Sequence, residues 1–166
     1  MSQKLGYIGL GKMGLALSKS LLKNGYDVYG YDIDPKRLEM LKEIGGNPVS
    51  SAKELAETCD IVFSILLKTE HIEENTFGDN GITKAKNQNF IFIEMSTMYP
   101  SWQVNLSSRL RKEGIEMLDA PISGSHPKVD DKTISIMVGG KKEIFDQIAP
   151  VLQSIAANVH YTGLNG

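Results

Sequence analysis

The sequence predicts an α/β fold in which one doubly wound, mainly parallel sheet carries helices on both faces. Short apolar runs of strand length alternate with segments of helical periodicity along nearly the whole chain. The runs at 60–67 and 90–94 are almost continuously apolar, as expected for strands that helices cover on both sides. The chain also opens on a strand-like run that leads directly into closely spaced glycines and a helical pattern. Together these features predict a Rossmann-type fold.

The opening stretch has the order strand, glycine turn, helix. Residues 5–8 are the predicted strand, and a helix is predicted from Met13 to about Lys23. The first glycine permits the tight turn, the second removes a side chain where a pyrophosphate must approach, and the third lets the helix pack on the strand. The phosphates would lie on the N–H groups at the positive end of the helix. The predicted dinucleotide-binding residues here are Gly9, Leu10, Gly11, Lys12, Met13 and Gly14.

A second strand is predicted at 26–31, after Asn24 and Gly25 end the helix. It leads to Asp32, where a carboxylate can accept hydrogen bonds from the adenosine ribose hydroxyls. The alternative is a structural glycine turn with an unrelated surface aspartate. The complete strand–helix–strand order favours the dinucleotide site over that alternative.

The rest of the chain continues the alternation. We expect the helix at 101–112 to bury Val104, Leu106 and Leu110. The other predicted elements are a helix from 35, an extended piece at 47–49, a helix from 52, a strand at 60–67, short helices at 70–74 and 82–85, strands at 90–94, 115–118, 133–138 and 159–161, and a helix at 141–154.

The composition bounds the class of protein. The 166 residues fit one domain, and 41% apolar and 23% charged residues are ordinary values for a globular protein. The net charge of −2 and the absence of a basic block argue against nucleic acid or a membrane surface as a partner. Cys59 is the only cysteine, and the chain shows neither a spanning apolar run nor a signal-peptide pattern. These features predict a cytoplasmic protein.

Ligands of a doubly wound sheet bind beyond the carboxyl ends of its strands, so the loops at that edge are candidate sites. We expect Leu67 and Lys68, at the end of the strand at 60–67, to contact the cofactor. Ser96 and Thr97 follow another strand and could bring hydroxyls near the nicotinamide or its ribose. The alternative is a helix cap before Pro100, and the two roles can coexist, since one residue can cap while its neighbour binds.

Ser123 and Gly124 offer a hydroxyl and backbone N–H groups in a turn, which suit a substrate carboxylate. A purely structural turn is the alternative. His71, His126 and His160 are scattered without the spacing of metal ligands, so no metal site is predicted.

Four motifs together resemble the β-hydroxyacid dehydrogenases, which include 3-hydroxyisobutyrate dehydrogenase, tartronate semialdehyde reductase and 6-phosphogluconate dehydrogenase. They are GLGKMG at 9–14, EMSTMYP at 94–100, DAPISG at 119–124 and MVGG at 137–140. The resemblance covers the whole chain, and DAPISG is its most specific part. It implies an N-terminal NAD(P)-binding domain, hydride transfer at an alcohol beside a carboxylate, and a small carboxylate substrate held partly by Ser123 and Gly124.

The sequence departs from this family in two places. SHPK at 125–128 follows Ser-Gly where the family usually has glycine, so a different substrate loop is expected. The resemblance also implies a lysine that acts as general acid and base, an asparagine one turn later, and an all-helical domain that forms the dimer. These would follow Gly166. We therefore expect residues 1–166 to be the cofactor-binding half of a homo-oligomeric enzyme, with no catalytic residue and no activity alone.

Asp32 would repel the 2′-phosphate of NADP and so favours NAD, although Lys36 and Arg37 could turn toward that phosphate. Two alternatives to a hydroxyacid dehydrogenase remain: a non-catalytic dinucleotide-binding or sensor module, and an NADPH-dependent imine or ketone reductase. The loop at 119–124 favours the dehydrogenase, because a sensor has no reason to keep a carboxylate-binding turn.

Overall fold

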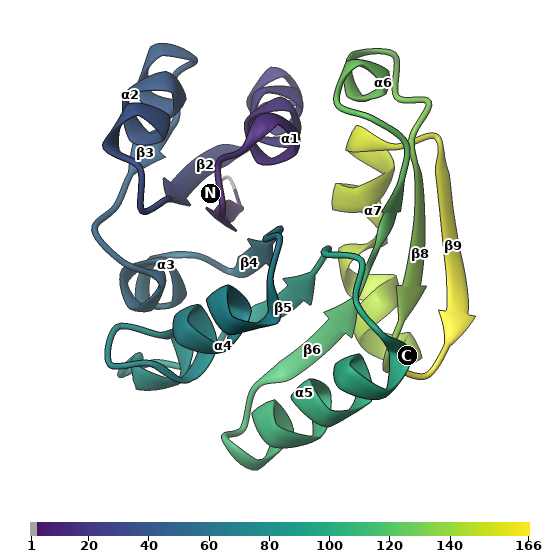
Figure 1. The fold of residues 1–166 in the computed structure, drawn as a ribbon. Helices are drawn as coiled ribbons and strands as arrows, with labels where there is room; N and C mark the ends of the chain where they lie inside the picture. The colour runs from purple at the N-terminus through teal and green to yellow at the C-terminus, as the bar shows by residue number, and fades with distance from the viewer. Residues whose placement is uncertain (1–2) are drawn as a thin grey trace.

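The computed structural model describes residues 3–166, which build one nine-stranded sheet with helices on both faces (Figure 1). The strands are β1 (Lys4–Ile8), β2 (Asp27–Tyr31), β3 (Asn47–Pro48), β4 (Ile61–Ser64), β5 (Ile91–Glu94), β6 (Glu116–Asp119), β7 (Ile122–Ser123), β8 (Ser135–Gly139) and β9 (Asn158–Gly163). The helices are α1 (Lys12–Lys23), α2 (Pro35–Glu43), α3 (Ala52–Thr58), α4 (Thr69–Phe77), the 3₁₀ turn η1 (Ile82–Lys84), α5 (Pro100–Lys112), α6 (Pro127–Asp130) and α7 (Lys142–Ile155).

The strands lie in the order β3-β2-β1-β4-β5-β6-β8-β7, and β9 pairs with β8. The neighbours from β3 to β6 are all parallel, whereas β8 joins β6 in antiparallel fashion where Gly139 pairs with Asp119. The order of the first six strands is that of the doubly wound dinucleotide-binding folds. The predicted fold class is confirmed, and the carboxyl ends of β1, β2, β4, β5 and β6 meet at one edge.

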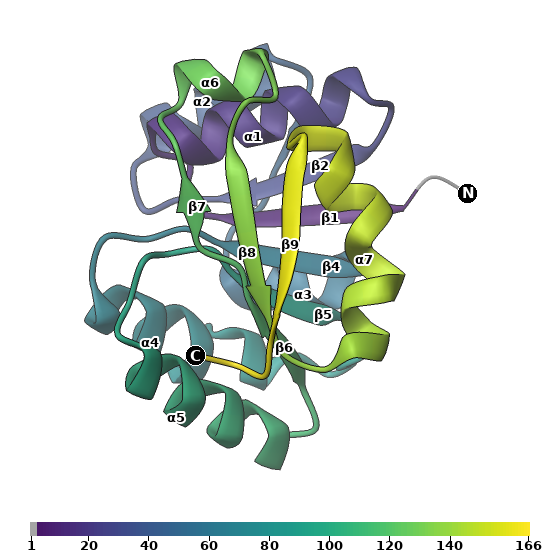
Figure 2. The same cartoon turned by 90° about the vertical axis from the view of Figure 1, so that its right-hand side faces the viewer.

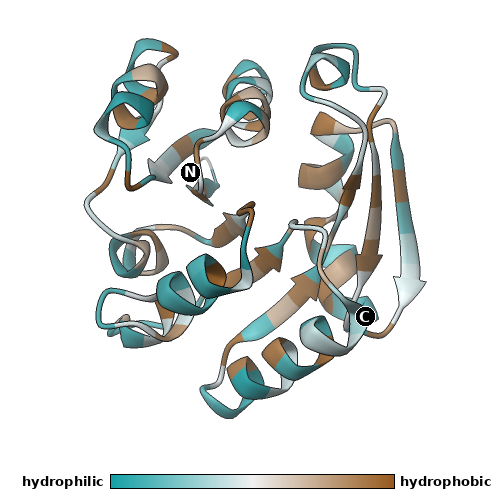
Figure 3. Ribbon diagram, viewed as in Figure 1, coloured by the Kyte–Doolittle hydropathy of each residue, from teal (hydrophilic) through white to brown (hydrophobic). Residues whose placement is uncertain are grey.

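Two apolar clusters fill the space between sheet and helices. One packs α1, α2 and α7 on one face, and the other packs α3, α4 and α5 on the opposite face (Figures 1 and 2). Tyr7 and Phe63, on the neighbouring strands β1 and β4, stack with ring centroids 4.8 Å apart. Figure 3 shows the matching pattern, with the apolar residues concentrated in the strands and on the inward sides of the helices.

Several elements differ from the sequence-based expectation. Helix α4 runs to Phe77 and is longer than the expected 70–74, because Ile72 and Thr76 give it an inward face. The strand expected at 60–67 ends at Ser64, and the loop after β6 contains the short strand β7 and the short helix α6. The burial of Val104 was predicted wrongly, since 49% of its surface is exposed.

The predicted burial of Leu106 and Leu110 is confirmed, and the inward face of α5 also includes two polar residues at positions that follow the helical period. The inward positions are Gln103, Leu106, Ser107 and Leu110.

Candidate functional site

The glycine turn connects β1 to α1 at the carboxyl edge, and its three glycines have different surroundings. Gly9 has φ +92°, and a Cβ there would lie 2.5 Å from the carbonyl oxygen of Ile65. A Cβ on Gly14 would lie 2.0 Å from the Gly9 carbonyl oxygen, so the helix packs directly on the turn. Around Gly11, in contrast, no atom of the described residues lies within 4 Å of a built Cβ. The turn is therefore closed on the protein side and open to solvent at Gly11.

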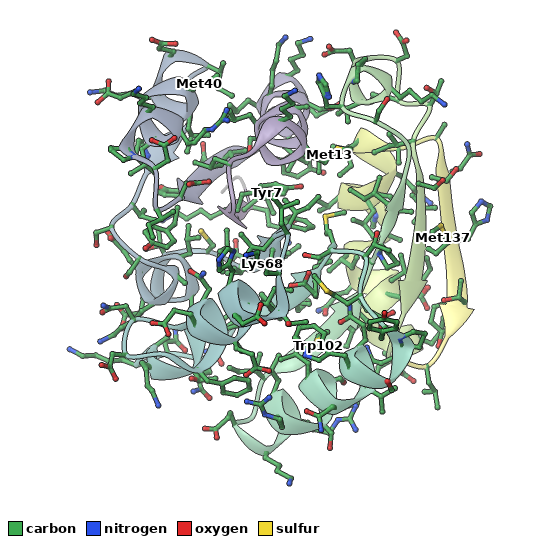
Figure 4. The ribbon with its side chains drawn as sticks, viewed as in Figure 1. Tyr7, Met13, Met40, Lys68, Trp102 and Met137 are labelled. Atoms are coloured by element: carbon green, nitrogen blue, oxygen red, sulfur yellow. The ribbon has the colours of Figure 1, made fainter. Side chains whose placement is uncertain are left out.

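The start of α1 offers backbone donors at this opening. The helix begins at Lys12, and no side chain of the described residues caps it. Leu10 is completely buried and its N–H donates to Asp32, whereas Lys12 is exposed and Met13 is partly buried. Figure 4 labels Met13 on the first turn of α1. The amides of this first turn meet the requirement for binding a phosphate.

Asp32 lies directly after β2 and beside the glycine turn. Its Oδ2 accepts a hydrogen bond from the Leu10 N–H at 2.7 Å, and its Oδ1 accepts one from the Asp34 N–H at 2.9 Å. The carboxylate thus braces the turn, and because each oxygen can accept a second hydrogen bond, acceptor capacity remains for ribose hydroxyls. The Arg37 side chain donates to the sulfur of Met40 at 3.8 Å, along its own helix.

Two hollows open along the same edge. The smaller hollow, of about 230 Å³, lies between the ends of β1 and β2 and helix α4; its lining includes Gly9, Asp32, Ile33, His71 and Asn75. The larger hollow, of about 890 Å³, has two walls, residues 67–71 after β4 and residues 97–100 after β5. His71 lines both hollows, so they are neighbours.

Three of the four predicted residues of the β4 and β5 loops line the larger hollow, and the fourth is buried. Leu67, 95% exposed, and Lys68 lie in one wall of the larger hollow, and Thr97 lies in the opposite wall (Figure 4, where Lys68 is labelled). Ser96 is buried at 3% exposure, and its Oγ accepts a hydrogen bond from the Leu66 N–H at 2.9 Å. The Ser96 hydroxyl therefore joins the two loops, and Thr97 is the hydroxyl that faces the hollow.

Ser123 and Gly124 lie in the hairpin that joins β7 to β8. Ser123 pairs with Ser135 across the hairpin, and Gly124 has φ +135°. Both are exposed, but neither lines the larger or the smaller hollow. Their role in substrate binding stays a prediction.

Two residues at this edge escaped the sequence analysis. His71, in the first turn of α4, was considered only as a metal ligand, but it lies between the two hollows. Glu94 closes β5 and is completely buried, and this burial raises the pKa of its carboxyl to about 7, although the Ser96 N–H and the nearby hydroxyls of Ser96 and Ser64 oppose the shift. An acidic residue at the end of an otherwise apolar strand was the available signal.

The geometry of this edge agrees with the comparisons to known proteins. The family described as the NAD binding domain of 6-phosphogluconate dehydrogenase matches residues 4–163. The chain belongs to this family. The carboxyl edge of an NAD-binding domain is therefore where the glycine turn, Asp32 and both hollows lie.

Individual relatives resemble this NAD-binding domain in sequence and in structure. The L-threonate dehydrogenase of Cupriavidus necator is 34% identical over 163 residues, which cover 98% of this chain and 55% of that protein. The structure of the Mycobacterium tuberculosis 3-hydroxyisobutyrate dehydrogenase with L-serine has a TM-score of 0.90 and 27% identity, over 99% of this chain and 56% of that one.

A more distant structural relative shows the same fold. The V8 variant of the imine reductase from Myxococcus stipitatus, in complex with NAD⁺, has a TM-score of 0.91 at 20% identity, covering 98% of this chain and 55% of that one. The NAD-binding domain spans about half the length of the relatives it matches. No helix within residues 3–166 is long and apolar enough to cross a membrane.

Proposed function

We propose that residues 1–166 form one Rossmann domain that binds NAD across the carboxyl edge of its sheet and serves a dehydrogenase of small β-hydroxyacids. The observation that carries the proposal is the contrast within the glycine turn. Gly9 and Gly14 are required by the packing of the turn itself, whereas Gly11 is surrounded by open space. A glycine that the fold does not need is expected where a ligand approaches the backbone.

The residues present fit an extended dinucleotide. The uncapped amides at the start of α1 would hold the pyrophosphate, Asp32 would accept hydrogen bonds from the adenosine ribose, and the smaller hollow would take the adenine. The larger hollow, with Lys68 and Thr97 in its walls, would take the nicotinamide end. When bound, the nicotinamide accepts or donates the hydride, and these residues hold it in place.

NAD is the preferred cofactor in this proposal. The Asp32 carboxylate is fixed by two backbone N–H groups, so it cannot easily turn away from a 2′-phosphate. Arg37 rests on Met40 and not beside Asp32. The like charges of a carboxylate and a phosphate therefore oppose NADP binding, and Lys36 is the remaining cation in the first turn of α2 that could compensate.

The hydroxyacid substrate is proposed from the relatives, since L-threonate and 3-hydroxyisobutyrate are both hydroxyacids. Ser123 and Gly124 are its proposed contacts, and the general acid and base is proposed to lie in the further length of the homo-oligomeric enzyme. The likeness to imine reductases shows the fold alone, so we do not adopt that substrate class. The free, buried thiol of Cys59 agrees with a reducing compartment such as the cytoplasm.

Calorimetric titration of the chain with NAD⁺ and NADP⁺ tests the proposal, with Gly11→Ala as the decisive variant. Gly11 has φ −64° and ψ −171°, which alanine adopts freely, so the unfolding temperature should not change. A methyl group facing the pyrophosphate should weaken NAD⁺ binding about tenfold or more. Gly14→Ala is the contrasting variant, because its Cβ collides with the turn and should lower stability. NAD⁺ binding by Gly11→Ala at the unchanged affinity would refute the site.

A further inference from the structure

A buried carboxyl lies beneath the loops of the larger hollow. Strand β5 lies between β4 and β6 (Figure 1). Its last residue, Glu94, is paired in register with Ser64 of β4 and with Asp119 of β6. Phe92, two residues earlier, belongs to the apolar cluster under α3, α4 and α5, so the Glu94 side chain points to the same face. A charged group with no exposed surface in this position calls for an explanation beyond packing.

Two hydrogen bonds connect this carboxyl to both walls of the larger hollow. Glu94 Oε1 accepts from the Ser96 N–H at 2.7 Å, which fixes the turn that leads into the wall at 97–100. Ser96 Oγ accepts from the Leu66 N–H at 2.9 Å, which fixes the residue that leads into the wall at 67–71. Glu94, Ser96 and Leu66 are thus joined by hydrogen bonds that link the segments leading into the two walls.

The second oxygen of the carboxyl is available for a further interaction. Glu94 Oε2 and the Ser64 hydroxyl are both buried, and neither has a hydrogen-bond partner among the described residues. Burial raises the pKa of Glu94 to about 7, and the nearby hydroxyls of Ser96 and Ser64 lower it in part. The bond from the Ser96 N–H strengthens when the carboxyl is ionised, because a charged acceptor binds a donor about twice as strongly as a neutral one.

Few other charges face this group. Asp119 is the titratable neighbour across the sheet, and its Oδ1 accepts from Asn165 Nδ2 at 2.8 Å and from the Gly166 N–H at 3.2 Å. The inward faces of α4 and α5, which cover Glu94, are uncharged; they consist of Ile72, Thr76, Gln103, Leu106, Ser107 and Leu110. In the larger hollow, Lys68, Glu70 and His71 carry charge or titrate, so His71 is a second candidate for any pH effect near neutrality.

We propose that Glu94 is a positioning residue for the nicotinamide end of the cofactor: acting through Ser96, its carboxyl holds the two walls of the larger hollow at their spacing, and it does so most firmly in the ionised form. The proposal rests on the proposed function. It assigns to Glu94 no contact with cofactor or substrate.

NAD⁺ affinity of the full chain, measured by calorimetry between pH 6 and pH 8, tests this role. The wild-type protein should bind NAD⁺ about three- to fivefold more tightly at pH 8 than at pH 6, the gain expected from one charge-assisted bond. Glu94→Gln keeps the size of the side chain and an acceptor for the Ser96 N–H, so it should fold but lose the pH dependence. Glu113→Gln, the same change at an exposed residue at the end of α5, should keep the wild-type profile.

Ser64→Ala separates positioning from mere structural support. It removes a hydroxyl that lowers the Glu94 pKa, so the midpoint of the binding profile should move to higher pH. If Glu94 only filled space, Ser64→Ala would leave the pH midpoint of NAD⁺ binding unchanged. A profile that persists in Glu94→Gln would belong to His71 and would overturn the proposal, as would a wild-type profile that is flat.

Stability supplies a readout that does not depend on the cofactor. The folded-state pKa of Glu94 is about 7 and its ordinary value is 4.5, so the folded protein retains a proton that the unfolded chain releases. The wild-type unfolding midpoint should therefore fall as the pH rises from 4.5 to about 7, and Glu94→Gln should lack this decline. Folded wild-type protein that binds no NAD⁺ at any pH would refute the proposed function itself, whereas binding with the same profile in every variant would refute only the role of Glu94.

Discussion

Asp32→Asn separates the structural and the selective roles of the carboxylate after β2. The aspartate uses both oxygens as acceptors, for the N–H groups of Leu10 and Asp34. Asparagine is nearly isosteric but has one acceptor and one donor group, so one of these two amides would face an NH₂ group. The variant also removes the negative charge that we propose discriminates against NADP.

The two effects have different expected sizes. A hydrogen bond to a charged group contributes about 1.5–3 kcal/mol, and since Asp32 is only partly buried we expect a stability loss of about 1–2 kcal/mol. Two unit charges about 5 Å apart repel by about 1–3 kcal/mol at the dielectric constants of a protein surface. Removing this repulsion should improve NADP⁺ affinity relative to NAD⁺ about tenfold or more.

Urea denaturation measures the first effect, and paired titrations with NAD⁺ and NADP⁺ measure the second. Asp27→Asn is the matched control, because Asp27 is an exposed aspartate at the opposite end of the same strand. The reasoning is refuted if the ratio of the two dissociation constants stays the same in Asp32→Asn, or if Asp27→Asn changes it equally.

Three further substitutions test interactions elsewhere in the fold. Arg109 donates two hydrogen bonds to Glu73, at 2.7 and 2.8 Å, and lies 4.0 Å from the Phe77 ring centroid, so Arg109→Ala should lower the unfolding free energy by about 1–2 kcal/mol. A double-mutant cycle with Glu73→Ala should show a coupling energy of about 0.5–1 kcal/mol, and a coupling energy of zero would contradict the ion pair. The backbone of Lys132 is in the left-handed region, with φ 55°, where glycine is not strained. Lys132→Gly should therefore raise the urea midpoint and increase the unfolding free energy by about 1 kcal/mol. The buried Tyr7 hydroxyl has no partner among the described residues, so Tyr7→Phe should stabilise the protein by about 1 kcal/mol, and a loss of thermal stability would reveal an overlooked interaction.

The local features of the fold could be predicted from the sequence because neighbouring residues determine them. The glycine turn and the helix after it follow from the order of residues 4–23, and Gly9 and Gly14 occupy the positions where a side chain would collide. The edge where the loops meet was also predictable. Parallel strands that are buried on both faces must bring their carboxyl ends together.

Features that depend on tertiary partners were not predictable in the same way. Val104 is apolar but lies outside the inward face of α5, whereas the polar Gln103 and Ser107 lie on it. An apolar residue was taken as buried although its spacing from Leu106 does not fit a helical face. In this helix, the period was a better guide than the hydropathy of a single position.

The role of the Ser96 hydroxyl also required the three-dimensional structure. Its partner, the Leu66 N–H, lies on a different strand's loop, and only the pairing of β4 with β5 brings them together. The sequence left open whether Ser96 or Thr97 faces the ligand. The structure buries Ser96 and exposes Thr97, because the tie to the neighbouring loop requires one of the two hydroxyls.

The capping of the helices gives a physical basis for the proposed phosphate site in a chain of net charge −2. Five helices follow parallel strands and begin at the carboxyl edge. Two of them are capped by their own side chains, since Asp34 accepts from the backbone of α2 and Ser51 accepts from that of α3. The starts of α1, α4 and α5, at Gly11, Lys68 and Tyr99, have no side-chain cap, and these three border the glycine turn and the larger hollow. The free N–H groups and helix dipoles therefore concentrate where the dinucleotide is proposed to lie, so its anionic part depends on backbone geometry more than on lysine or arginine.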